Sequence, residues 1–135
     1  MSRRNLDAGQ ITFSQAMANI NSYMDYLKDL DTKLTATDWV LKNVDSCSLT
    51  EKQLDEAIRI ALYDLYSLQS ELNKIKTNVL SYQIKYEQLL KKSSEKSIEF
   101  NSKIESINEL WDEKRNLISG KIERCNKVMW GALSV

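Results

Sequence analysis

The sequence holds few residues that could carry out chemistry, and their spacing does not favour catalysis. Histidine, the commonest general base and zinc ligand, is absent from the 135 residues. Acidic residues at helical spacing, such as Asp55 and Glu56, lie among lysines and arginines, as on solvated helix faces. The three glycines form no phosphate-binding loop. We therefore expect no enzymatic activity, no cofactor, no metal site and no small-molecule substrate.

The two cysteines, Cys47 and Cys125, also offer little chemistry. Neither belongs to a CxxC pair, and two cysteines do not make a disulfide framework. We interpret both as small thiols of a reducing compartment, with Cys125 in the core and Cys47 in a loop. Whether they ever pair stays open.

Charge and hydropathy argue against nucleic acid and membrane roles. The chain carries 19 basic and 19 acidic side chains with interspersed signs, so no basic face is available for a nucleic acid. No apolar run approaches the roughly 20 residues that span a bilayer. The N-terminal residues lack the apolar core of a Sec-type signal peptide. The expected location is therefore cytoplasmic, with export by another route left open.

Long helices are expected from the absence of proline and the scarcity of glycine, which also argue against an all-β fold. Residues 1–10 lack periodicity and are predicted to be a mobile N-terminal arm, followed by a single helical coiled-coil domain at 11–135. A first helix is predicted over 11–45, with a possible interruption at 35–38 where Thr and Asp compete for backbone hydrogen bonds. Its seam, spaced by three or four residues, has polar lapses at Asp31 and Asp38.

Two more helices follow from local signals. Ser48 with Glu51, and Thr50 with Gln53, fit overlapping capping boxes, so a second helix is expected to begin near 49–51. Its seam has the clearest pattern in the chain and consists of Leu54, Ile58, Ala61, Leu65, Leu68, Leu72, Ile75, Val79, Tyr82, Tyr86 and Leu89. The polar segment 91–97 favours a turn before a third helix at about 97–130. The alternative is a continuous helix from about 50 to 118 that forms an intermolecular coiled coil.

These elements predict an all-α fold, an elongated antiparallel three-helix coiled-coil bundle. In this arrangement two neighbours cover one side of the stretch 57–68 and leave Ile60, Tyr63 and Tyr66 on the other side. Tyrosine suits a surface that is wet when free and dry when bound, so these three residues form a candidate partner-binding patch. Trp39 and Trp130, expected toward one end of the bundle, form a second candidate contact surface.

The pattern therefore favours a non-catalytic helical coiled-coil structural or adaptor subunit within a larger assembly. Its expected partner is another protein or further copies of the same chain, bound through helix–helix contacts. The alternative is a small helical chaperone or escort that covers a secreted or assembly-prone partner.

Overall fold

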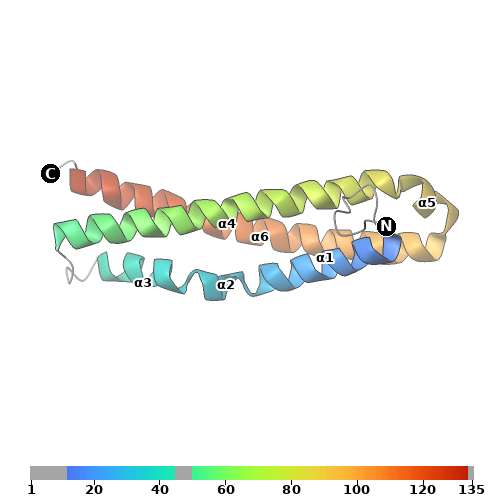
Figure 1. The fold of residues 1–135 in the computed structure, drawn as a ribbon, viewed down its shortest axis with the longest axis horizontal. Helices are drawn as coiled ribbons and strands as arrows, with labels where there is room; N and C mark the ends of the chain where they lie inside the picture. The colour runs from blue at the N-terminus through green and yellow to red at the C-terminus, as the bar shows by residue number, and fades with distance from the viewer. Residues whose placement is uncertain (1–11, 45–49, 134–135) are drawn as a thin grey trace, which may run out of the picture. The chain divides into compact units, whose positions relative to one another are not determined.

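The computed structural model describes residues 12–44 and 50–133 (Figure 1). Every regular element in these ranges is an α-helix, which confirms the all-α prediction. The elements are α1 (Phe13–Lys28), α2 (Leu30–Lys33), α3 (Thr35–Val44), α4 (Glu51–Lys85), α5 (Glu87–Lys92) and α6 (Ser94–Leu133). The predicted arm at 1–10, Cys47 and the Ser48–Glu51 capping box fall at least partly outside the described residues.

The chain divides into two compact units, which are described one at a time. Unit 1 combines residues 1–28 with 73–112, and unit 2 combines 29–72 with 113–135. Each unit contains three helical segments of the chain, which pack on one another. A single domain over 11–135 stays a prediction.

The first predicted helix is broken twice, and the breaks lie before the segment 35–38 where an interruption was expected. Asp29 separates α1 from α2, and Leu34, with φ −98° and ψ 0°, separates α2 from α3. Nearby hydroxyls compete for the helix hydrogen bonds, because Thr32 Oγ1 donates to the carbonyl of Asp29 at 2.7 Å and Thr35 Oγ1 donates to that of Thr32 at 3.0 Å. The amide of Leu34 donates to the carbonyl of Asp31, only three residues back.

The start of α4 follows the predicted capping box. The amide of Gln53 donates to Thr50 Oγ1 at 3.2 Å, and the amide of Thr50 donates to Gln53 Oε1 at 3.0 Å. This reciprocal pair satisfies two amides that a helix start leaves without a carbonyl.

The turn after the second helix is confirmed, and the continuous helix from 50 to 118 is wrong. Ser93 has extended backbone angles, φ −140° and ψ 105°, which end α5. Its Oγ then accepts a hydrogen bond from the amide of Lys96 at 3.3 Å, so Ser93 also caps the start of α6. Figure 1 shows the chain reversing direction at this point within unit 1.

In unit 1, aromatic contacts and hydrogen bonds of asparagine side chains hold α1 against the other helices. Phe13 packs edge-on against Tyr86 at 5.3 Å between centroids and lies 5.7 Å from Phe100. Farther along α1, Asn19 donates to the Tyr82 hydroxyl at 3.0 Å. The last two turns are tied by Asn78 to Tyr23 (2.9 Å) and by Lys103 to Asn21 (2.8 Å).

In unit 2, two lysine–aspartate pairs join the broken helix to α6. Lys114 Nζ lies 3.3 Å from Asp31 Oδ1, and Lys121 pairs with Asp38. Both members advance by seven residues, so α2 and α3 run parallel to α6 with matching heptads. The prediction that Asp31 and Asp38 lie on the seam is wrong, because both are exposed and the neighbouring Leu30 and Thr37 are buried instead. The buried apolar side chains of unit 2 include Leu30, Leu34, Val40, Leu41, Ile58, Ala61, Leu62, Leu65, Leu72, Ile118, Ile122 and Cys125.

Candidate protein-contact surface

The predicted patch on α4 lies on the solvent side of unit 2, and we call Ile60, Tyr63 and Tyr66 the outer face of α4. Ile60 is 64% exposed, Tyr63 74% and Tyr66 49%. The buried positions of the same stretch, including Ile58 and Leu65, point the opposite way because a helix turns about 100° per residue. The outer face therefore belongs to the surface of the isolated chain.

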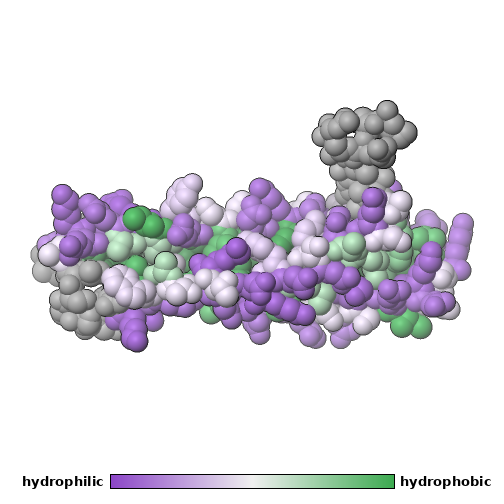
Figure 2. Space-filling model, turned by 60° about the horizontal axis from the view of Figure 1, so that its bottom comes forward, coloured by the Kyte–Doolittle hydropathy of each residue, from purple (hydrophilic) through white to green (hydrophobic). Residues whose placement is uncertain are grey.

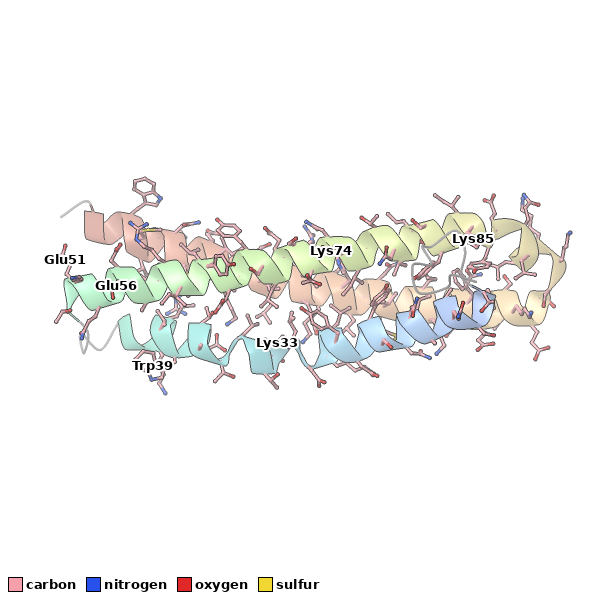
Figure 3. All side chains as sticks on the ribbon, in the orientation of Figure 1. Lys33, Trp39, Glu51, Glu56, Lys74 and Lys85 are labelled. Carbon is pink, nitrogen blue, oxygen red and sulfur yellow. The ribbon has the colours of Figure 1, made fainter. Side chains whose placement is uncertain are left out.

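The two predicted tryptophans are also exposed, Trp39 at 54% and Trp130 at 66%. Trp39 projects outward from α3 in Figure 3. Trp130 lies on α6, three turns after Ser119, and both tryptophans belong to unit 2. Trp111 differs, because it is half-buried in unit 1 with the Lys76 ammonium 4.8 Å from its ring centroid.

The structure brings Tyr66 and Trp130 together at one hollow between α4 and α6. The hollow has a volume of about 530 Å³, and Gln69, Ile122 and Asn126 contribute to its lining. Folding the chain near residue 94 places Tyr66 opposite Ile122 by simple counting, so this approach follows from the turn. Gln69 and Asn126 carry no signal in the sequence that would have singled them out.

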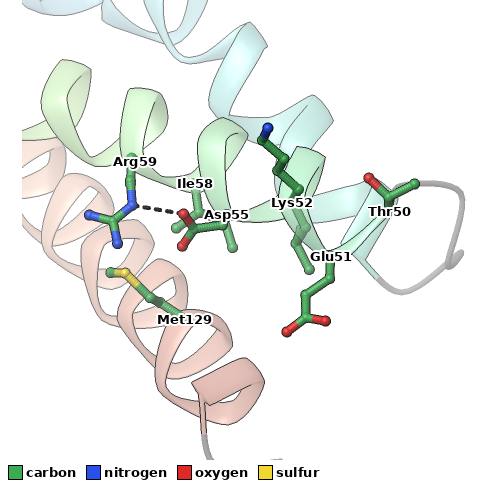
Figure 4. A pocket seen from close by; sticks show the side chains of 8 residues that line it. Thr50, Glu51, Lys52, Asp55, Ile58, Arg59 and Met129 are labelled. Carbon is green, nitrogen blue, oxygen red and sulfur yellow. Dashed lines mark hydrogen bonds and ion pairs between the residues drawn. The ribbon is translucent and has the colours of Figure 1, made fainter.

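A second hollow lies beside the first turns of α4 and faces Met129 of α6 (Figure 4). Its volume is about 580 Å³. The Arg59 guanidinium is engaged there by Asp55 at 2.9 Å, and Glu51 and Lys52 offset each other in charge. The arrangement offers mixed, largely exposed charges and no converging set of polar groups that would orient a substrate.

Burial is the main cause of the shifted pKa values in this molecule. Burial raises the pKa of the Cys125 thiol, and the nearby Lys121 and Arg124 lower it only in part, so the thiol stays protonated and weakly nucleophilic. Burial, helped by a hydrogen bond with Tyr82, raises the pKa of Tyr23 to about 12. Within 12–44 and 50–133, no group of three or more His, Cys, Asp or Glu side chains is placed to hold a metal ion.

The face of the molecule in Figure 2 is mostly hydrophilic, with separate hydrophobic patches among the charged side chains. Unit 1 contributes Leu80, Ile84 and Ile98 to the exposed large apolar residues, which the sequence analysis did not select. None of the described helices is long and apolar enough to cross a membrane.

The comparisons with known proteins add no family. The chain matches no protein-family model, no curated protein and no solved structure.

Proposed function

We propose that this protein is a non-catalytic structural or adaptor subunit that works by helix–helix contact with another protein chain. The outer face of α4 is the observation that carries the proposal. Ile60, Tyr63 and Tyr66 follow one another at intervals of three residues and project into solvent from a helix whose other side is buried. Apolar and phenolic side chains of this kind are enriched where protein surfaces meet.

A helix is the element that best fits this face. Side chains three residues apart form a ridge along a helix, and such ridges pack into the grooves of a second helix. In unit 2, α4 is covered by α2 and α3 on one flank and by α6 on the other, so an added helix would complete a four-helix arrangement. Tyrosine hydroxyls remain at the rim, where they find water or polar partners.

The escort function is the second candidate, and the hollow between Tyr66 and Trp130 favours it. An open volume of about 530 Å³ lined by an isoleucine and two exposed aromatic residues suits a segment of a client protein. The native mass separates the candidates. A stable complex of fixed stoichiometry supports the structural role, whereas a monomer that exchanges its partner supports the escort role.

The test replaces Ile60 and Tyr63 together, as Ile60→Lys with Tyr63→Asp, which leaves the net charge unchanged. The protein is isolated from its native cells, and the mass of the native species is measured beside its melting temperature. Exposed substitutions usually change stability by about 0.5 kcal/mol or less each, so the melting temperature should hardly move. Burying the new charges at a contact costs far more, so association should weaken at least about tenfold.

The matched control places the same two charges on α6 of unit 1, as Ser102→Lys with Ser106→Asp. Both serines are exposed, so neither stability nor association should change. Unchanged association of the Ile60 and Tyr63 variant would refute the proposal. Unfolding of that variant as a monomer would also refute it, because the outer face would then be covered from within.

A further inference from the structure

The segment formed by α2 and α3, residues 30–44, packs on the other helices of unit 2 through buried leucines and through two ion pairs with exposed carboxylates. We call it the strap. The strap follows a break at Asp29 and contains a second break at Leu34. Its first helix, α2, has four residues and no side-chain cap, so it gains little from its own hydrogen bonds. The strap therefore depends on its contacts with α4 and α6.

The strap carries two exposed carboxylates beside its buried seam, which includes Leu30, Leu34 and Thr37. Asp31 and Asp38 meet Lys114 and Lys121 of α6. The Lys114 side chain is only 8% exposed while the Asp31 side chain is 65% exposed, so a buried stem carries its ammonium to a carboxylate at the rim. Pairs with an exposed member are weakened by salt.

A surface hollow borders the strap beside the second ion pair. The hollow, of about 480 Å³, lies between α3 and α6, lined in part by Asp38, Leu41 and Lys121. Gly120 borders it, and a Cβ built on Gly120 would meet nothing within 4 Å.

We infer that the strap is a displaceable segment, and that a partner helix takes its place between α4 and α6 in unit 2. The partner is an acidic amphipathic helix with an apolar seam and two carboxylates seven residues apart. Charge complementarity selects it, because Lys114 and Lys121 are spaced by seven residues and their stems are already buried. The inference goes beyond the proposed function, since the strap site is separate from the outer face of α4.

Displacement exposes apolar surface that the incoming helix has to cover. Leu30, Leu34 and Leu41 of the strap are buried, as are Leu62 and Ile118 on the helices beneath. A helix that supplies leucines at strap positions and acids at two of them replaces each contact by an equivalent one. Replacing the strap by the partner helix then changes the contact free energy little. Small differences in helix stability therefore determine which of the two helices occupies the site.

The experiment uses the full chain with the strap charges reversed, Asp31→Lys with Asp38→Lys, which places like charges against Lys114 and Lys121. Hydrogen exchange is followed amide by amide. The strap should lose its protection by at least about tenfold while α1 keeps its own, because α1 is held by contacts within unit 1. Retained strap protection, or equal loss of protection in α1, would overturn the inference.

A synthetic peptide with the sequence of residues 29–44 then serves as the probe of the opened site. The peptide should bind the charge-reversed chain and restore protection to α6. A peptide carrying the same two reversals should bind at least about tenfold more weakly, since its lysines meet Lys114 and Lys121. Equal binding of both peptides, or no binding of either, would overturn the assignment of the partner.

The Ile60→Lys, Tyr63→Asp variant separates this inference from the proposed function. When these changes are added to the charge-reversed chain, peptide binding should stay the same, because the outer face of α4 points away from the strap. Loss of native association with unchanged peptide binding would support both claims. Loss of peptide binding in that chain would overturn the strap site alone.

Discussion

Unit 1 holds its first helix through aromatic rings and side-chain amides, whereas unit 2 adds two lysine–aspartate pairs to the buried leucines that hold α2 and α3. In unit 1, one aromatic cluster joins all three helical segments through Phe13, Tyr86 and Phe100. In unit 2, the exposed Asp31 and Asp38 reach lysines of α6. The same coiled-coil geometry is thus stabilised mainly by packing in one unit and partly by exposed charge in the other.

The two units also differ in what they leave on the surface. Unit 2 exposes Trp39, Ile60, Tyr63, Tyr66 and Trp130, and four of these are aromatic residues with a polar atom at the ring edge. The large apolar residues that unit 1 exposes are aliphatic: Leu80, Ile84 and Ile98. Exposed ion pairs on α2 and α3 and an exposed aromatic surface occur in the same unit. This combination is expected of a region that exchanges contacts with other chains.

The largest expected effects come from the two cores. Phe100→Ala in unit 1 should reduce the free energy of unfolding by about 3–5 kcal/mol, and Leu65→Ala in unit 2 by about 2–5 kcal/mol, because both side chains are fully buried. Urea titration followed by tryptophan fluorescence reads both units, since Trp111 lies in unit 1 and Trp130 in unit 2. An unchanged midpoint for either variant would show that its seam position is misassigned.

The ion pairs of unit 2 should give an asymmetric response. Asp31→Ala removes one carboxylate partner of Lys114 and should cost at most about 1 kcal/mol, because Asp31 is exposed and Lys114 Nζ also lies 3.4 Å from Glu113 Oε2. Lys114→Met replaces the ammonium by apolar volume and should be neutral or stabilising. Thermal unfolding of both variants checks this, and equal losses in the two would contradict an electrostatic attachment of the strap.

The phenol network of unit 1 should make stability depend on alkaline pH. The pKa of Tyr23 is about 12 in the folded chain and 10.0 in its ordinary state, so the unfolded chain loses this proton first. The contribution of Tyr23 is complete below pH 10 and is lost as the pH rises toward 12. The Tyr23→Phe variant should show a smaller fall over this range in urea titrations. An identical fall in both proteins would refute the assignment.

The smallest expected effect is a gain. Gly120→Ala should stabilise the chain by about 1 kcal/mol, because alanine favours the helical state of α6 and the new methyl group meets no neighbour within 4 Å. The melting temperature measures it, and a decrease would mean that α3 lies closer to α6 than the hollow indicates. Hydrogen exchange in the same variant shows whether the gain reaches the strap.

Local signals made much of the fold predictable. Thr50 and Gln53 predict the start of α4, because a capping box needs only residues within one turn of the chain. The polar stretch around Ser93 marks the reversal for a similar local reason. Burial of Leu65, Leu72 and Ile107 follows from the heptad spacing, since a seam of that period has to face its neighbours.

The features that were not predicted depend on residues far apart in the chain, or on side-chain hydroxyls that compete with backbone amides for carbonyl groups. The spacing placed Asp31 and Asp38 on the seam, but both are exposed and pair with Lys114 and Lys121, which lie 83 positions later in the chain. The breaks at Asp29 and Leu34 reflect hydroxyl-to-carbonyl hydrogen bonds whose geometry residue types alone do not set. Exposure of the outer face of α4 was predictable, because the buried seam of the same helix fixes which residues point away from it.

The most direct test of the account is photo-crosslinking from the outer face of α4. A photoreactive phenylalanine analogue is placed at Tyr63 or, as a control, at the exposed Ser106 of unit 1, and the chain is irradiated in its native cells. The account predicts a discrete crosslinked product from position 63, with another protein or a second copy, and none from position 106. Absence of a product at position 63, or the same products from both positions, would contradict a protein contact on this face.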